Sequence, residues 1–220
     1  MRINIRSTFD VELVQCMGSD EMVARAARVS TGRDQITQEK IVGLIGYLAR
    51  ERHTSPFESC TATVRITAPL FVVQQVLRHR TFSYSQLSHR YTEASPEFYV
   101  PAPERPLSNQ GSSAHPDLQH DPEIPYSAVL SAHEAGFKDA WSSYQELIGM
   151  GVANEVARNV LPASIYTSLY MTGNLLNWIK FLKLRNGSEG HPQFEIAEVA
   201  NEIERQLTEK YPITMKAWMN

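Results

Sequence analysis

The spacing of hydrophobic residues in the first fifty positions predicts a short strand followed by two helices. Residues 2–7 have a strand-like pattern. Ser19 or Asp20 can cap a helix that continues through Ala27, and Thr37 can cap a longer helix. The apolar residues of this second helix recur at helical spacing, at Ile41, Leu44, Ile45 and Leu48. We expect both helices to serve as scaffold.

Residues 59–67 alternate between apolar and polar side chains, which is typical of a half-buried strand. The apolar face of this strand contains Cys60, Ala62, Val64 and Ile66. Cys60 is therefore expected in the core. Pro69 suits the first turn of a following helix, which predicts that Arg78 to Arg80 lie at the C-terminal end of that helix.

Proline residues interrupt the chain repeatedly at about residues 101–126, among Ser, Asn, Gln and His residues. This composition cannot sustain a helix or a central strand, so it predicts a long mobile loop. Loops of this length are often lids or binding segments, and a disordered insertion is the alternative. After the loop, the pattern predicts helices at 127–149, 152–161, 174–185 and 192–210, with a strand at 164–171.

The order of these elements favours an α+β fold, because helices and strands follow one another without a regular βαβ rhythm. A chain of 220 residues can bury one sizeable core, and we expect a single domain over residues 1–220. The formal charge of −3 and a pI near 6.2 argue against non-specific binding to nucleic acid or an anionic membrane.

Cysteine content and hydropathy favour a cytoplasmic protein. Only Cys16 and Cys60 are present, and no CxxC pair occurs, so a disulfide framework or a thiolate metal site has little support. The N-terminus lacks the apolar run of a secretory signal, and no stretch approaches the roughly 18 uninterrupted apolar residues of a membrane span.

The run from Arg78 to Tyr91 carries the clearest chemical signal. It contains three arginines, two histidines and several hydroxyls, and no Asp or Glu occurs between Glu58 and Glu93. Neighbouring guanidinium groups repel one another unless an anionic ligand or remote carboxylates compensate their charge. An isolated Arg-His-Arg triplet is usually a solvated turn, but the serines and Arg90 that follow it match the needs of phosphate oxygens. We therefore expect a phosphate-bearing ligand.

Other candidate sites are weaker when taken singly. His79 and His89 lack ligating partners at helical metal-site spacing, so no metal site is predicted. The segment from His53 to Glu58 exposes several polar groups together, but it can also be interpreted as a polar turn without a functional role. Arg158 can serve the helix dipole or pair with Glu155 instead of binding a ligand.

Taken together and in this order, the residues resemble the flavin-dependent thymidylate synthases, whose hallmark is Arg-His-Arg, about seven residues and a serine. Here the motif is Arg78-His79-Arg80 followed by seven residues and Ser88. The likeness extends through most of the chain outside the Pro-rich loop, at Ala26–Ser30, His53–Glu58, Ala68–Val72, Gln75, Arg90–Tyr91, Phe98–Pro101, Ala157–Arg158, Leu161–Pro162 and Leu182–Arg185.

This resemblance implies an α+β fold with a central, mostly antiparallel twisted sheet, flanking helices and homotetrameric assembly, with active sites shared between subunits. It implies reductive methylation of dUMP to dTMP, with methylene-tetrahydrofolate as carbon donor, FAD as hydride carrier and NADPH as reductant. The alternative is a catalytically degenerate member that binds a nucleotide and acts in regulation or assembly.

The resemblance also assigns site residues. Those expected at dUMP are Gln75, Arg78, Gln86, Leu87, Ser88, His89, Arg90, Arg158 and Arg185. Those expected at FAD are His53, Ser55, Arg78, His79, Arg80, Gln86, Asn174 and Lys180. The chain departs from the family pattern at Gln86, where many relatives have Glu, and at Leu176, where an arginine often contacts the flavin's phosphate side.

The implied catalytic residue is Arg185. Uracil C5 is a poor nucleophile, and a cation at the pyrimidine edge stabilises the negative charge that develops when N3 loses its proton. Electron density then shifts toward C5, which can attack the one-carbon donor without a covalent bond to the enzyme. No cysteine nucleophile is required, in agreement with the core position expected for Cys60.

Overall fold

The computed structural model describes residues 2–32, 37–112 and 115–219. The chain divides into two compact units, each built from three separate segments. Unit 1 comprises Met1–Phe9, Thr67–Gln75 and Gln86–Ser168. Unit 2 comprises Asp10–Ile66, Val76–Ser85 and Leu169–Asn220. The single domain expected over residues 1–220 stays a prediction.

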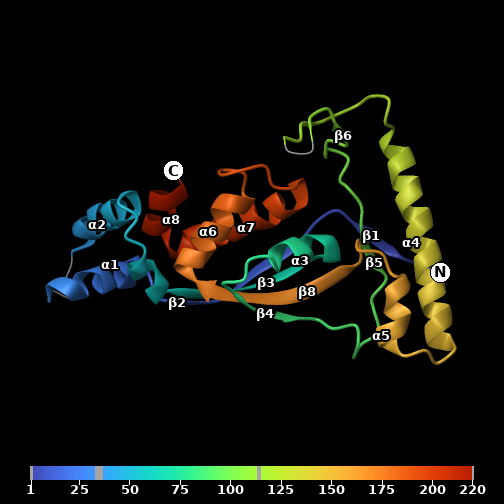
Figure 1. The fold of residues 1–220 in the computed structure, drawn as a ribbon, viewed down its shortest axis with the longest axis horizontal. Helices are drawn as coiled ribbons and strands as arrows, with labels where there is room; N and C mark the ends of the chain where they lie inside the picture. Colours follow the sequence, from blue (N-terminus) through green and yellow to red (C-terminus); the bar gives the residue numbers. More distant parts are fainter. Residues whose placement is uncertain (1, 33–36, 113–114, 220) are drawn as a thin grey trace. The chain divides into compact units, whose positions relative to one another are not determined.

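Unit 1 combines short strands with helices. Its elements, several shown in Figure 1, are β1 (Asn4–Arg6), most of α3 (Leu70–Val76), β5 (Glu97–Tyr99), β6 (Ser108–Asn109), β7 (Leu118–Gln119), α4 (Tyr126–Gly149) and α5 (Asn154–Ala157), followed by a 3₁₀ turn, η3 (Arg158–Val160). Strand β1 pairs in parallel with β5, and β6 pairs antiparallel with β7. Helices α4 and α5 lie side by side and contact each other.

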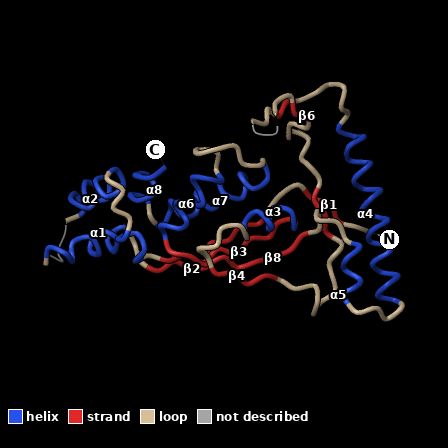
Figure 2. The backbone as a smooth tube through the Cα atoms, viewed as in Figure 1, coloured by secondary structure: helices blue, strands red, loops and turns tan. Residues whose placement is uncertain are grey.

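Unit 2 holds most of the remaining helices. Its elements are β2 (Asp10–Met17), α1 (Asp20–Arg28), η1 (Val29–Thr31), α2 (Gln38–Arg50), η2 (Ser55–Ser59), α6 (Leu175–Arg185), α7 (Phe194–Lys210) and α8 (Pro212–Met219). Figure 2 shows α1, α2 and α8 close together, and each contacts the other two. Helices α6 and α7 also pack against each other.

Three further strands contribute residues to both units: β3 (Thr61–Pro69), β4 (Ser83–Gln86) and β8 (Tyr166–Asn174). They join β2 in a four-stranded sheet with the order β2-β3-β8-β4. The Thr63 hydroxyl lies 2.9 Å from that of Thr172, and the Thr67 hydroxyl lies 2.7 Å from that of Ser168. Because one partner number rises as the other falls, β3 and β8 are antiparallel. The expectation of a mostly antiparallel sheet with flanking helices is thereby confirmed.

Two predicted helix caps are present. The Ser19 hydroxyl accepts a hydrogen bond from the Met22 amide at 3.4 Å at the start of α1. The Asn174 side-chain oxygen accepts one from the Asn177 amide at 2.9 Å at the start of α6. Thr37 occupies the N-cap position of α2, but its side chain makes no capping hydrogen bond.

The alternation that predicts strand β3 matches its burial, and Cys60 is fully buried as expected. The Arg-His-Arg motif follows the C-terminal end of a helix, as expected, but α3 ends at Val76, so the motif lies just beyond the helix and not in its last turn. The Tyr84 hydroxyl donates to the carbonyl oxygens of Val76 at 2.9 Å and His79 at 2.8 Å. These bonds satisfy carbonyl groups that a continuing helix would have used, so the chain turns here.

Several elements differ from the sequence-based expectation. The predicted helix at 152–161 consists of the short α5 and the η3 turn, and the last predicted helix begins at Phe194 instead of Pro192. Strand β2 was not expected, although Val11 and Leu13 alternate with exposed acidic residues. Helix α8 was also not expected, because its start depends on remote Asp20, whose carboxylate accepts hydrogen bonds from two backbone amides of α8.

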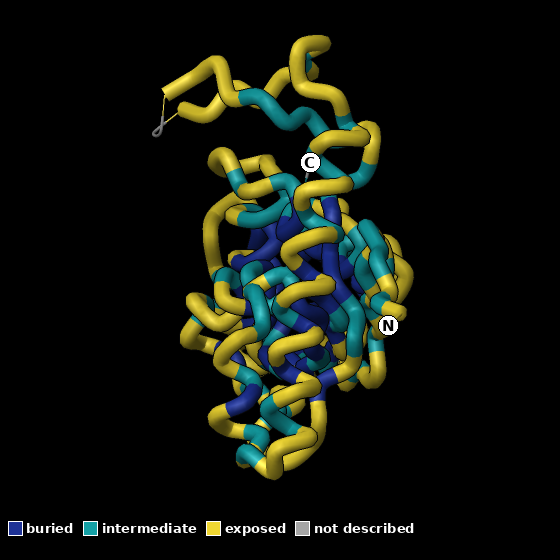
Figure 3. The backbone as a smooth tube through the Cα atoms, turned by 90° about the vertical axis from the view of Figure 1, so that its right-hand side faces the viewer, coloured by how far each residue is buried: buried dark blue, intermediate teal, exposed yellow. Residues whose placement is uncertain are grey.

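The Pro-rich segment of unit 1 is mostly exposed or partly buried along the backbone, as Figure 3 shows. Its regular structure within the described residues is the two-residue ladder of β6 and β7. The Tyr126 hydroxyl donates to the Pro101 carbonyl oxygen at 2.9 Å and ties the two ends of the segment together. A role for this segment as a lid stays a prediction.

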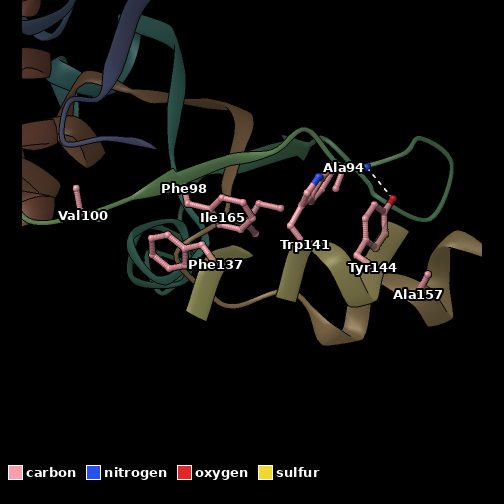
Figure 4. Packing of buried hydrophobic residues seen from close by; sticks show 8 residues of the cluster. All are labelled: Ala94, Phe98, Val100, Phe137, Trp141, Tyr144, Ala157 and Ile165. Carbon is pink, nitrogen blue, oxygen red and sulfur yellow. Dashed lines mark hydrogen bonds between the residues drawn. The ribbon is translucent and has the colours of Figure 1, made fainter. Parts of the chain in front are cut away.

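Each unit has its own buried cluster. In unit 1 the Phe98 and Phe137 rings stack with centroids 4.9 Å apart, and the Tyr144 hydroxyl accepts a hydrogen bond from the Ala94 amide (Figure 4). In unit 2 the largest fully buried side chains include Trp178 and Phe181 of α6. Among the described residues, no helix is both long and apolar enough to cross a lipid bilayer.

Candidate functional site

Unit 1 contains a cavity of about 390 Å³, a volume within the usual range of small-molecule sites. It is lined by Leu70, Gln86, Leu87, His89, Arg158, Asn159, Leu161, Ile165 and Thr167. The lining thus combines an aliphatic wall with a few polar groups and one cation. Four of the predicted dUMP residues, Gln86, Leu87, His89 and Arg158, meet here. The cavity can hold a small anionic ligand with an apolar part.

The edge of the cavity is fixed by contacts to strand β8. The Leu87 amide donates to the Ser168 carbonyl oxygen at 2.8 Å. The Gln86 side-chain amide lies 3.5 Å from the Thr167 hydroxyl, which is a long hydrogen bond. Thr167 itself is buried, with 4% of its surface exposed. Gln86 therefore keeps most of its hydrogen-bonding capacity for a ligand.

His89 and Arg158 share this cavity, and the charge of Arg158 acts on the His89 ring. Both ring nitrogens of His89 are buried without a well-formed hydrogen bond among the described residues. Burial and the nearby Arg158 charge lower the pKa of His89, and backbone groups of Thr92 and Tyr166 offset this only in part. His89 is consequently neutral at physiological pH and offers one donor and one acceptor.

Arg90 lies outside the described lining of the cavity, together with Gln75 and Ser88 of the same unit. The Arg90 Nε donates to Glu155 Oε2 at 2.9 Å, and both side chains are about half exposed. The alternative interpretation that Glu155 pairs with Arg158 is therefore wrong. Arg158 forms no ion pair with a residue that the structure describes, so its charge is available to a ligand.

In unit 2 the end of α6 meets the Arg-His-Arg motif. Arg185 Nε donates to His79 Nε2 across 3.0 Å. Burial, and then the Arg185 charge, lower the pKa of His79 to about 4. Burial also lowers the pKa of Arg185, although a guanidinium stays charged throughout the physiological range. The predicted catalytic arginine is thus paired with a neutral imidazole.

The other predicted residues of unit 2 present mainly exposed polar groups. Arg78, Arg80 and Lys180 are exposed, and none forms an ion pair with a described residue. His53 and Ser55, also exposed, lie between α2 and the following 3₁₀ turn. The His53 ring lies edge-on to Tyr47, with centroids 5.6 Å apart. Leu176 is buried and belongs to the core of unit 2.

Sequence reasoning assigned no site role to several residues that build these two groups, although Leu70 and Leu161 lie within motifs that carry the family resemblance. In the cavity they are Leu70, Asn159, Leu161, Ile165 and Thr167. For the end of α3 the missed residue is Tyr84, whose hydroxyl is the donor to two main-chain carbonyl oxygens. A tyrosine within an arginine-rich run was the available signal, but its partners could not be read from spacing.

Comparison with known proteins gives a consistent assignment. The family described as thymidylate synthase complementing protein matches residues 12–213. A flavin-dependent thymidylate synthase of Streptomyces coelicolor is 38% identical over 229 residues, covering 99% of this chain and 93% of that protein. Another, from Thermosipho africanus, is 39% identical over 209 residues, covering 95% of this chain and 90% of that protein.

The fold also matches solved structures. The UMP/dUMP methylase PolB from Streptomyces cacaoi bound with 5-Br UMP has a TM-score of 0.92 and 38% identity, covering 100% of this chain and 97% of that chain. The same methylase bound with 5-Br dUMP has a TM-score of 0.90, covering 99% and 97% of the two chains. This chain therefore belongs to the thymidylate synthase complementing protein family, the family of the flavin-dependent thymidylate synthases.

Proposed function

We propose that this enzyme methylates dUMP to dTMP, with methylene-tetrahydrofolate as carbon donor, FAD as hydride carrier and NADPH as reductant. The observation that supports this most is the cavity of unit 1, whose lining includes four residues that the family resemblance places at dUMP. The full-length similarity to flavin-dependent thymidylate synthases supports the reaction class.

In the proposed complex, Arg158 binds the phosphate of dUMP. Its guanidinium lines the cavity and has no competing ion pair among the described residues, and a planar fork of donors suits phosphate oxygens. The aliphatic wall at Leu161 and Ile165 suits the apolar faces of the nucleoside. Gln86 supplies both a donor and an acceptor for hydroxyl or carbonyl groups. Gln75, Leu87, Ser88, His89 and Arg90 complete the proposed set in unit 1.

Arg185 is the proposed catalytic residue. Its positive charge would stabilise the pyrimidine as N3 loses a proton, which increases electron density at C5 for attack on the one-carbon donor. Arg185 Nε is occupied by His79, but the terminal nitrogens Nη1 and Nη2 carry four further N–H donors. The guanidinium can therefore keep its contact to His79 while binding the ring.

The exposed cations of unit 2 fit a flavin dinucleotide. The diphosphate of FAD carries negative charge, and Arg78, Arg80 and Lys180 are exposed without ion pairs among the described residues. The resemblance adds His53, Ser55, His79, Gln86 and Asn174 to this proposed set. Because Leu176 is a core residue, Lys180 is the candidate that replaces the arginine found there in relatives. When bound, FAD supplies the hydride that completes the methyl group.

The proposed reaction uses no cysteine nucleophile. Cys60 is fully buried, its Sγ lies 3.6 Å from the Ser19 carbonyl oxygen, and burial raises the pKa of its thiol. Burial raises the pKa of the partly buried Cys16 thiol as well. The Tyr211 hydroxyl and the Lys210 charge act on Cys16 in the opposite direction, but burial is the larger effect, so both thiols hold their protons more tightly than a free cysteine does.

The proposal includes a cytoplasmic homotetramer whose subunits share active sites, as the resemblance implies. Sedimentation of the purified protein tests the assembly directly. A mass of four chains would support it, whereas a monomer that turns over dUMP would exclude shared sites.

UMP is a second candidate substrate, because the similar solved structures are of a UMP/dUMP methylase, one of them bound with 5-Br UMP. The test is to assay methylated product with dUMP or UMP in the presence of FAD, NADPH and methylene-tetrahydrofolate, leaving out each component in turn. Product with dUMP that requires all components supports the proposal. Nucleotide binding without product under any condition would favour the degenerate, regulatory alternative.

A further inference from the structure

The contact between Arg185 and His79 defines the protonation state of the imidazole. An arginine Nε carries a hydrogen and can only donate, so the His79 Nε2 that it contacts at 3.0 Å must present its lone pair. The remaining ring proton therefore resides on Nδ1. A doubly protonated ring would direct a hydrogen at the Arg185 hydrogen and place two positive charges side by side.

The surroundings of His79 hold its ring in place. The ring lies edge-on to Phe181 of α6, with centroids 4.7 Å apart at an angle of 71°. Phe181 is fully buried and its ring also contacts Phe82, so the Phe181 ring has little room to move away from His79. The aromatic contact and the bond from Arg185 arrive from the same helix, because residues 181 and 185 are one helical turn apart.

The main chain at His79 is fixed as well. The Tyr84 hydroxyl donates to the carbonyl oxygens of His79 and Val76, and the His79 amide donates to Val76 at 3.1 Å. Burial raises the pKa of Tyr84 to about 12, so its hydroxyl remains a donor at physiological pH. Described groups thus constrain both the ring and the backbone of His79.

Arg185, in contrast, stands at the last position of α6, where a long side chain has many rotamers. Its bond to His79 restrains the direction of the Nε–H bond and, because the guanidinium is planar, limits where Nη1 and Nη2 can lie. Those two nitrogens are the donors left for a ligand. Pre-positioning of this kind lowers the cost of placing a charge at a reacting group.

We propose that His79 is a positioning residue for Arg185, accepting at Nε2 in its neutral Nδ1–H form and thereby orienting the guanidinium toward the pyrimidine. This rests on the proposed function. It also specifies which atom of His79 can form the flavin contact that the family resemblance assigns to this residue. Nε2 already accepts the hydrogen bond from Arg185, so only the Nδ1 proton is left for the cofactor.

The tautomer can be measured without any turnover. Protein labelled with ¹⁵N-histidine is recorded by long-range ¹H–¹⁵N correlation at pH 7.5, and His79 is identified among the seven histidines by its loss in His79→Gln. The proposal predicts an Nδ1–H ring with unprotonated Nε2, and a shift toward the ordinary tautomer mixture in Arg185→Met. An Nε2–H ring in the wild-type protein would overturn it.

Kinetics separates positioning from cofactor binding. His79→Leu removes the acceptor. At saturating FAD, with one flavin bound per chain, it should lower kcat about ten- to a hundred-fold, the effect expected from losing a hydrogen bond to a charged group. His79→Gln, whose side-chain oxygen can accept from Arg185, should recover part of the loss. Equal losses in Leu and Gln variants, or loss of FAD with normal kcat after reconstitution, would contradict the proposal.

The outcomes also distinguish this inference from the proposed function. If the wild-type protein forms no methylated product, the reaction assignment fails, yet the tautomer measurement still reports whether Arg185 is held by His79. If the wild-type protein turns over dUMP and His79→Leu does so equally fast, the positioning role alone is refuted. Tyr84→Phe is a second test, because it removes a hydroxyl contact to the His79 main chain and leaves the Nε2 acceptor intact. Its kcat should fall less than that of His79→Leu, and an equal or larger fall would contradict the role of the Nε2 acceptor.

Discussion

Removal of Cys60 tests the absence of a thiolate in the mechanism. Cys60→Ala deletes a fully buried sulfur whose Sγ lies 3.6 Å from the Ser19 carbonyl oxygen. A thiol with an ordinary pKa of about 8.5 is roughly one tenth ionised at pH 7.5, and burial raises the pKa of Cys60 further. The proposed mechanism therefore predicts that kcat changes by less than about threefold, since a group outside the reaction contributes little to the barrier.

The same substitution should cost stability. Deleting one buried heavy atom of methylene size, with a small cavity left behind, is expected to lower the free energy of unfolding by about 1–2 kcal/mol. For a chain of this size this corresponds to a fall in Tm of about 2–8 °C. The nearby Tyr211 hydroxyl should keep its bonds to the carbonyl oxygens of Met17 at 3.0 Å and Thr61 at 3.4 Å.

The assay measures dTMP formed per bound FAD in Cys60→Ala, Cys16→Ala and the double variant, below their transition temperatures. Thermal denaturation of each variant controls for folding. A folded, flavin-loaded Cys60→Ala protein that loses about 10⁴-fold or more in kcat would show that the thiol takes part in the chemistry and would refute the reasoning.

Three further predictions concern stability. Asp20→Ala should lower the free energy of unfolding by about 2–4 kcal/mol, because the Asp20 carboxylate accepts hydrogen bonds from the amides of Ile213 and Thr214, both at 2.9 Å. In urea titrations, Asp20→Asn should lose less stability than Asp20→Ala. Equal losses of stability would contradict this prediction. Arg52→Gly should gain about 0.5 kcal/mol in the same titration, because Arg52 adopts φ of 55° in the left-handed region, and a loss would reveal a contribution from its side chain. The pKa of His79 is lowered from 6.5 to about 4 in the folded protein, so the unfolded chain binds a proton at this residue first as pH falls. The contribution of His79 to the free energy of unfolding is therefore complete above pH 6.5 and is lost as pH falls toward 4. His79→Gln should flatten this pH dependence, and an unchanged slope would contradict the prediction.

Local patterns predicted those elements whose causes are local. The alternation around Val64 and the capping residues Ser19 and Asn174 each act within a few residues, so β3, α1 and α6 follow from the sequence. Helix α8 depends instead on a carboxylate 193 positions earlier in the chain, at Asp20. Contacts of that separation leave no periodic signal.

The candidate site shows the same division. The Arg-His-Arg motif and Ser88 could be recognised because they are close together in the sequence. The bond between His79 and Arg185 joins residues 106 positions apart, and the pairing of Arg90 with Glu155 joins residues 65 apart. The spacing suggested Glu155 as the helical partner of Arg158, but in the structure Glu155 forms its ion pair with Arg90.

The central claim is that this chain couples oxidation of a reduced flavin to methylation of dUMP. The most direct measurement is an anaerobic single turnover: FAD-loaded protein is bleached with NADPH, freed of excess reductant, and mixed with dUMP and methylene-tetrahydrofolate while absorbance and dTMP are followed together. We predict that the flavin absorbance returns as one dTMP forms for each flavin reoxidised. Flavin that stays reduced, or that reoxidises without dTMP, would contradict the assignment.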